Sequence, residues 1–167
     1  MNHKLSRSLF ALLAAGGLTL APAANAADAY AGAKAGFMLA DAANQDAALN
    51  IGGLFGVKLL DFGQKAGTLS AEGELSFTLI DGDLPNGNDW DVSTLGAYAV
   101  YRSAGDMYLK AKAGLLWLDT SYDSSITELS MGIGGGWRIN KDLALEVEYT
   151  TIDDNIDMFS VGVNFHF

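Results

Sequence analysis

The chain has 167 residues, half of them hydrophobic, with 20 acidic and 10 basic residues and a formal net charge of −10 at pH 7. Such an acidic chain excludes nucleic acid as a favoured partner, because phosphate binding needs a basic surface. It contains no cysteine, so no disulfide can stabilise the fold.

Residues 1–26 have the parts of a secretory signal peptide. Lys4 and Arg7 supply positive charge, a short apolar stretch follows, and Ala24-Asn25-Ala26 forms an A-x-A cleavage site. The apolar stretch is too short and too rich in Gly and Ala for a good membrane anchor, so we expect cleavage. The predicted mature domain is 27–167, which keeps 8 of the 10 basic residues and all 20 acidic ones, a net charge of −12.

The mature chain is rich in apolar residues and yet contains no stretch typical of a membrane-spanning helix. In lipid every backbone donor and acceptor must be paired, and the alternative to a helix is a β-sheet with no free edge. Apolar and polar residues alternate with period two in eight segments, separated by Gly, Asn, Asp and Ser clusters. We place these strands at 29–39, 48–58, 67–80, 90–102, 105–118, 126–138, 142–151 and 156–167.

The predicted fold is all-β, an eight-stranded antiparallel up-and-down transmembrane β-barrel. A soluble sandwich would share the period, but here the strand charges lie on the face opposite the large apolar residues. In 142–151, for example, Glu146 and Glu148 alternate with Leu145 and Val147. Aromatic residues also form two bands, typical of membrane-interface girdles, at Tyr101, Trp137 and Phe167 and at Phe37, Trp117, Tyr149 and Phe159.

The connections between the predicted strands alternate in length. Tight turns at 103–105 and 140–142 are expected to face the periplasm, with longer loops on the other side. With an even number of strands, both mature termini are expected at the periplasmic end as well.

The C-terminal residues resemble the assembly signal of outer-membrane proteins, with polar Ser160, then Gly162, and aromatic Phe165 and Phe167 at the third-last and last positions. With its eight strands, the whole mature chain resembles the small outer-membrane β-barrel family, which includes the transmembrane domain of outer membrane protein A and the OmpX and Ail group. The resemblance implies the outer membrane of a Gram-negative envelope, contact with its lipids and lipopolysaccharide, insertion by the barrel assembly machinery with periplasmic chaperones, and a monomer. No peptidoglycan-binding domain follows Phe167, so cell-wall tethering is not expected, and the short loops argue against an adhesin.

An eight-stranded barrel is just wide enough to be filled by its own side chains, which excludes a wide aqueous pore. Inward-facing charges are predicted to form one layer near mid-barrel, alternating basic and acidic around the axis, from Lys34, Glu72, Glu74, Lys110, Lys112, Glu146 and Glu148. Nearer the periplasmic end, positive charge is added by Lys58, Arg102 and Arg138.

Two interpretations of these lumen charges remain open. The first is a structural plug of ion pairs, since charges in a confined lumen must be paired or hydrated. The second, implied by the resemblance to outer membrane protein A, is a gate. There, Glu72 or Glu74 exchanges partners among Lys110, Lys112 and Arg138 and briefly opens a narrow path for small ions.

Eleven of the fifteen aspartates fall in the four longer loops, which contain no Lys or Arg: Asp41, Asp46, Asp81, Asp83, Asp89, Asp91, Asp119, Asp123, Asp153, Asp154 and Asp157. This rim repels polyanions such as heparin-like chains and bare lipopolysaccharide phosphates. Divalent cations can bridge such carboxylates to lipopolysaccharide, and Asp81, Asp83 and Asp89 are weak candidate metal ligands. Their spacing does not match the EF-hand pattern, and Asp, Asn and Gly are also ordinary turn formers.

No enzyme activity, catalytic residue or cofactor is predicted. Some small outer-membrane barrels modify lipid A, generally with a histidine near the outer rim, whereas the mature histidine here, His166, is predicted to point inward at the periplasmic end. We expect an integral barrel with a structural role in the envelope, to which the charged lumen can add weak small-ion permeability. The alternatives are a surface module that binds cations, lipopolysaccharide or a host or phage protein through its acidic loops, and a lipid A-modifying enzyme.

Overall fold

The computed structural model describes residues 29–40, 46–63, 65–83, 89–120 and 126–167. The predicted signal peptide lies outside these residues. The described chain forms ten strands: β1 (Ala29–Ala40), β2 (Ala48–Asp61), β3 (Thr68–Ile80), β4 (Gly82–Asp83), β5 (Asp89–Trp90), β6 (Val92–Arg102), β7 (Met107–Thr120), β8 (Ile126–Arg138), β9 (Leu143–Asp153) and β10 (Ile156–His166).

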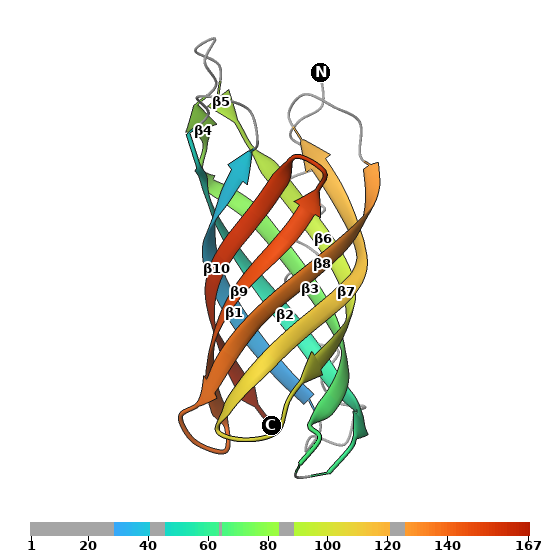
Figure 1. Cartoon of the computed structure of the whole chain (residues 1–167). Helices are drawn as coiled ribbons and strands as arrows, with labels where there is room; N and C mark the ends of the chain where they lie inside the picture. Colours follow the sequence, from blue (N-terminus) through green and yellow to red (C-terminus); the bar gives the residue numbers. More distant parts are fainter. Residues whose placement is uncertain (1–28, 41–45, 64, 84–88, 121–125) are drawn as a thin grey trace.

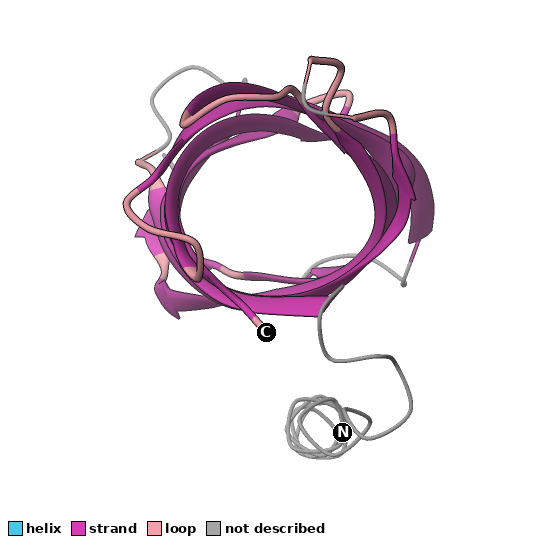
Figure 2. Ribbon diagram, turned by 90° about the horizontal axis from the view of Figure 1, so that it is seen from below, coloured by secondary structure: helices cyan, strands magenta, loops and turns pink. Residues whose placement is uncertain are grey.

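Eight of these strands close into a barrel in the order β1-β10-β9-β8-β7-β6-β3-β2, and β4 pairs with β5 as a small separate ladder. Every neighbouring pair is antiparallel, and β10 closes the ring by pairing with β1, so that Lys34 lies opposite Gly162. Figure 1 shows the tilted strands and Figure 2 the closed ring seen along the barrel. The predicted eight-stranded antiparallel barrel is therefore confirmed.

The two ends of the barrel differ. Residues 62–63, 65–67, 103–106 and 139–142, which lie between strands, are at the end where the C-terminus emerges, the lower end in Figure 1, which we call the turn end. The opposite end, where β4 and β5 project, is called the loop end.

The strand boundaries differ from the predicted ones in two instructive places. A register shift between Lys58 and Leu60 lets β2 stay paired with β3 as far as Asp61. The predicted fourth longer loop is wrong, because β9 and β10 are joined by a tight turn at 154–155. The side chain of Asp153 accepts a hydrogen bond from the backbone N–H of Asn155 at 2.7 Å, which closes this turn locally.

Between the register shifts, side chains alternate between the wall's two faces. In β9, Leu145, Val147 and Tyr149 are exposed on the outside, whereas Glu146 and Glu148 are buried in the lumen. The seven aromatic residues of the two predicted bands all point outward, with exposed fractions between 38% and 57%. The outer wall is thus an apolar surface suited to lipid.

Inward tyrosines lie flat against the wall over glycines of the next strand. Tyr30 is paired with Gly56, and Tyr108 with Gly136. A Cβ atom at Gly56 would lie 2.1 Å from the Tyr30 ring, and one at Gly136 would lie 2.3 Å from the Tyr108 ring. Only glycine leaves room for these rings, which place their hydroxyl groups in the lumen.

Within the described part of the chain, no helix is long and apolar enough to cross a membrane.

Candidate functional site

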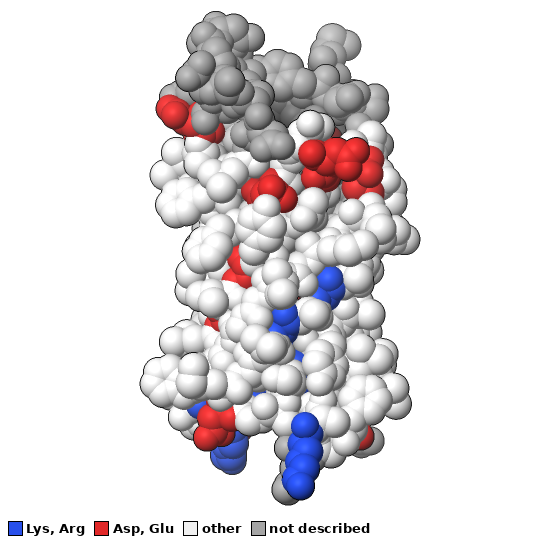
Figure 3. Space-filling model, viewed as in Figure 1, with Lys and Arg blue, Asp and Glu red and all other residues white. Residues whose placement is uncertain are grey.

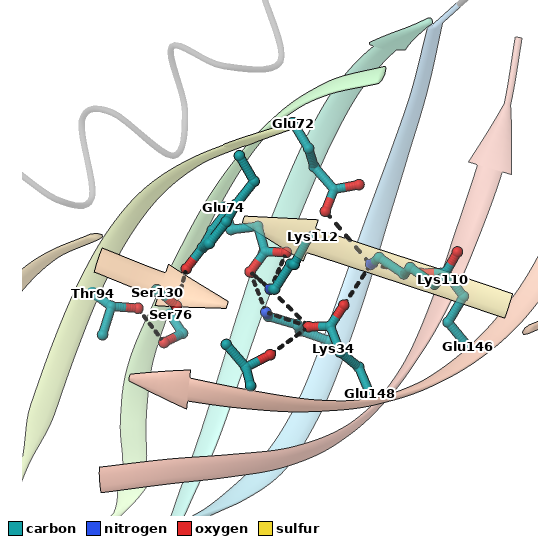
Figure 4. A network of polar contacts seen from close by, with 12 residues as sticks. Lys34, Glu72, Glu74, Ser76, Thr94, Lys110, Lys112, Ser130, Glu146 and Glu148 are labelled. Carbon is teal, nitrogen blue, oxygen red and sulfur yellow. Dashed lines mark hydrogen bonds and ion pairs between the residues drawn. The ribbon is translucent and has the colours of Figure 1, made fainter. Parts of the chain in front are cut away.

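The lumen holds four basic and four acidic side chains that form two stacked squares of ion pairs. All eight side chains are nearly inaccessible to solvent, with exposed fractions of 8% or less. In the upper square, basic and acidic groups alternate around the ring of strands. In the lower square the two basic side chains come from the neighbouring strands β6 and β7, and each of them contacts both carboxylates. Figure 4 shows the square nearer the loop end, with parts of the other beside it.

The upper square, nearer the loop end, consists of Lys34 of β1, Glu74 of β3, Lys112 of β7 and Glu148 of β9. The Lys112 Nζ atom lies 2.6 Å from Glu74 Oε1 and 2.7 Å from Glu148 Oε1. Lys34 is ion-paired with Glu74, and its Nζ lies 3.8 Å from Glu148 Oε1. Lys112 also lies over the Tyr98 ring, 4.2 Å from its centroid.

The lower square consists of Glu72 of β3, Arg102 of β6, Lys110 of β7 and Glu146 of β9. Arg102 lies 2.7 Å from Glu146 Oε1 through its Nε and 3.0 Å from Glu72 Oε2 through a terminal nitrogen. The Lys110 Nζ atom lies 2.9 Å from Glu146 Oε2 and 3.6 Å from Glu72 Oε1. Lys110 also joins the two squares, because the same Nζ lies 2.6 Å from Glu148 Oε2.

Two wall tyrosines complete the lower square. The Tyr30 hydroxyl donates a hydrogen bond to Glu72 Oε2 and accepts one from Arg102, both at 2.7 Å. The Tyr108 hydroxyl donates to Glu146 Oε1 at 2.7 Å. Buried charges are tolerated when they are paired and their remaining hydrogen-bonding capacity is used, and the four positive and four negative groups here also cancel in net charge.

The structure brings together all seven residues of the predicted charged layer, and Arg102 with them, but distributes them over two levels rather than the one predicted. It does not bring Arg138 into either square. The Arg138 guanidinium lies 4.5 Å from the centroid of the Tyr108 ring and donates to the Gly105 carbonyl at the turn end. Arg102 is the arginine of the lower square, because its long side chain reaches from the end of β6 toward mid-barrel. The gating role of these residues stays a prediction.

Sequence reasoning missed an apolar layer above the upper square. We call it the apolar cap, and it is formed by Met38, Ala48, Trp90, Val92, Leu116, Leu118, Ile152 and Met158. A signal was present in the sequence, because Met38, Leu116 and Ile152 each follow a member of the upper square by four residues on the same strand face. Between square and cap lie hydroxyl groups, including Ser76 and Thr94, whose oxygens are 2.7 Å apart.

The described aspartates at the loop end form an acidic rim, whereas basic side chains are visible at the turn end (Figure 3). Two of the predicted rim residues, Asp41 and Asp123, lie outside the described residues, as does the side chain of Asp83. Among the residues that are described, no group of three or more His, Cys, Asp or Glu side chains is placed to hold a metal ion. His166 lies half-buried at the turn end, its ring centroid 5.1 Å from that of Tyr30.

The predicted assembly signal forms the closing strand of the barrel. Ser160 and Gly162 belong to the lumen face of β10, whereas Phe165 and Phe167 are exposed on the outer face with ring centroids 5.5 Å apart. The backbone N–H of Phe167 donates to the Ala29 carbonyl at 3.0 Å, which fastens the end of the chain to β1. Recognition of this segment by an assembly machinery stays a prediction.

A closed antiparallel barrel with an apolar outer wall and a polar, filled lumen defines the class of integral β-barrel membrane proteins. Residues 10–167 match the family model described as outer membrane protein beta-barrel domain. The chain therefore belongs to this family and is an integral protein of the bacterial outer membrane.

The fold is similar to those of several solved small barrels. Neisserial surface protein A is 15% identical with a TM-score of 0.52, over 83% of this chain and 96% of that one. The outer membrane enzyme PagL is 12% identical with a TM-score of 0.53, over 83% and 99%. The outer membrane protein Ail of Yersinia pestis is 13% identical with a TM-score of 0.51, over 84% and 100%. At these identities the likeness is one of fold, and none of the curated proteins matches the chain in sequence.

Proposed function

We propose that the protein is a structural component of the outer membrane whose lumen is held shut at rest and admits small ions only weakly. The observation that carries this proposal is the pair of stacked squares, in which each buried charge has a partner of opposite sign. A lumen filled in this way supports a rigid barrel and leaves no continuous aqueous path.

In each square one ion pair is wider than the others, and the exchange of partners would begin at this pair. In the upper square it is the 3.8 Å separation of Lys34 and Glu148, and in the lower square the 3.6 Å separation of Lys110 and Glu72. Glu74 is a near partner of both lysines of the upper square, so removing its charge leaves Lys34 with only the 3.8 Å contact to Glu148 and makes Lys112 depend on Glu148 alone. We therefore expect Glu74 to control the upper square more strongly than any other single residue.

Planar-bilayer recording of the folded protein tests this proposal. The native protein should show rare, small current steps, and Glu74→Gln should make them more frequent by about tenfold, corresponding to the loss of roughly 1.4 kcal/mol of pairing. Lys141→Met, which removes an exposed lysine of the turn at 139–142, is the matched control and should leave the currents unchanged. Unaltered currents in Glu74→Gln, or a large steady pore in the native protein, would contradict the proposal.

We further propose that residues 1–26 direct export and are then removed. The barrel assembly machinery, aided by periplasmic chaperones, would recognise the C-terminal strand. The folded barrel would be a monomer embedded in lipid and lipopolysaccharide. Outer-membrane barrels keep short turns in the periplasm and longer loops outside, so the turn end would face the periplasm. Closure of the barrel supports the monomer, because none of its eight described strands has a free edge to pair with a second chain.

A surface binding role is the second candidate, favoured by the acidic loop end. Such a rim suits cations or a basic partner protein and disfavours polyanions. Binding that falls with added salt, or that requires divalent cations, would support this role over the structural one.

We infer no enzyme activity, although the outer membrane enzyme PagL shares the fold. His166 lies at the turn end, and overexpression should leave lipid A acylation unchanged.

A further inference from the structure

The side chains that line the lumen change in chemical type, in steps, toward the loop end. On β7, Lys110 and Lys112 are followed on the same face by Leu116 and Leu118. On β9, Ile152 takes the corresponding position above Glu148. The lumen therefore runs from charged groups, through hydroxyl groups, into the apolar cap.

The apolar cap is tightly closed. Met38, Met158, Val92, Leu116 and Leu118 are all exposed by 2% or less, and they come from two opposite pairs of neighbouring strands, β1 with β10 and β6 with β7. The indole of Trp90 adds to this layer and donates from Nε1 to the Asp46 carbonyl at 3.2 Å, so its polar atom is satisfied outside the apolar layer. On β8 the same level carries a half-buried carboxylate, Glu128.

We propose that the apolar cap is a second barrier, which acts in series with the ion-pair squares and closes the lumen toward the outside, so that water and small ions that enter from the turn end stop beneath it. An ion that reaches the squares meets carboxylates and ammonium groups that replace part of its hydration. The cap side chains offer aliphatic and aromatic carbon and thioether sulfur in place of such groups, and apolar constrictions of this kind exclude ions by dewetting. This inference rests on the proposed function, because it concerns the path through the same lumen.

A buried polar side chain beneath the cap supports water entry from the turn end. Asn164 of β10 is exposed by only 1%, and neither its Nδ2 nor its Oδ1 has a hydrogen-bond partner among the described residues. Buried amides are almost always satisfied, by water where protein offers nothing. By contrast, no side chain of the apolar cap contributes an unsatisfied buried polar atom.

Cysteine reactivity tests the proposal without depending on conductance, since the native chain has no cysteine. Thr94→Cys places a thiol between the upper square and the cap, and Asn164→Cys places one beside the lower square. In nanodiscs, a small cationic methanethiosulfonate should modify Asn164→Cys readily and Thr94→Cys at least about tenfold more slowly. Were the squares the outer barrier, Thr94→Cys would react quickly through the loop end.

Opening the cap should then expose the thiol of Thr94→Cys. Adding Leu116→Gln should raise about tenfold the rate at which the methanethiosulfonate modifies this thiol, whereas the apolar replacement Leu116→Met should leave that rate unchanged. Ile152→Thr is a second cap variant, used if the unheated gel band shows that Leu116→Gln does not fold. Fast reaction of Thr94→Cys with the native cap, or no acceleration in either folded polar variant, overturns the proposal.

The two proposals can fail separately. If Leu116→Gln accelerates the thiol reaction but neither it nor Glu74→Gln passes current, ion permeability fails and the cap stands. If Glu74→Gln raises the current while the cap variants leave the thiol of Thr94→Cys unreactive, the cap proposal fails and the proposed function stands.

Discussion

Replacing Lys110 by methionine should destabilise the folded barrel more than any other single removal of a lumen lysine. Its ammonium group lies within 3.6 Å of Glu72, Glu146 and Glu148 and is the link between the two squares. Methionine keeps most of the aliphatic volume but leaves three basic groups against four carboxylates. Removing one partner from a buried ion pair typically costs about 3 to 5 kcal/mol, because the remaining charge is left uncompensated.

Urea titration of the refolded protein, with the folded fraction read from the unheated gel band, measures this cost. Lys141→Met removes a lysine whose side chain is 88% exposed and should change the unfolding free energy by less than about 0.5 kcal/mol. Combining Lys110→Met with Glu148→Gln should recover about 1 to 3 kcal/mol, since it removes one of the uncompensated carboxylates. Equal stability of Lys110→Met and Lys141→Met would refute the view that the squares hold the lumen together.

Three further outcomes are expected. Gly136→Ala should lower the unfolding free energy by about 1 to 3 kcal/mol, because its methyl group would meet the ring of the tyrosine opposite, whereas outward-facing Gly135→Ala should be tolerated in the same titration. Among variants that keep one tryptophan, brominated lipid should quench the fluorescence of Trp117 on the outer wall strongly and that of Trp90 in the cap weakly; equal quenching would contradict the placement of the cap. Phe167→Ala should reduce the amount of folded protein in outer membranes, and an undiminished heat-modifiable band would count against the assembly signal.

The barrel itself could be predicted from the sequence because period-two alternation fixes which face of each strand meets lipid. Glu146 and Glu148 between Leu145, Val147 and Tyr149 suffice to orient β9, and the same logic applies to the other strands. Closure then follows from the need to pair every backbone group in the membrane. Strand ends were less predictable, since the register shift near Lys58 and the tight turn at 154–155 depend on local pairing.

Which residues form the candidate site could be predicted better than how they are arranged. Counting along each strand placed the lumen charges correctly on the inner face, but strand tilt offsets neighbouring strands along the axis and resolves the single expected layer into two. Strand position alone does not show whether an arginine joins a square. The Arg102 side chain extends toward mid-barrel and pairs with Glu146, whereas the Arg138 guanidinium lies over the Tyr108 ring at the turn end. The apolar cap is harder to predict than the squares, because apolar residues of the inner face do not differ in type from the lipid-facing residues of the outer face.

Gel mobility and bilayer recording together provide the most direct test of the central claim, that the chain is an outer-membrane barrel sealed by paired charges. Protein from isolated outer membranes should migrate differently before and after boiling, and the unheated form should give only brief, small currents. An identical mobility in both samples would contradict the barrel, and a large steady conductance would contradict the sealed lumen.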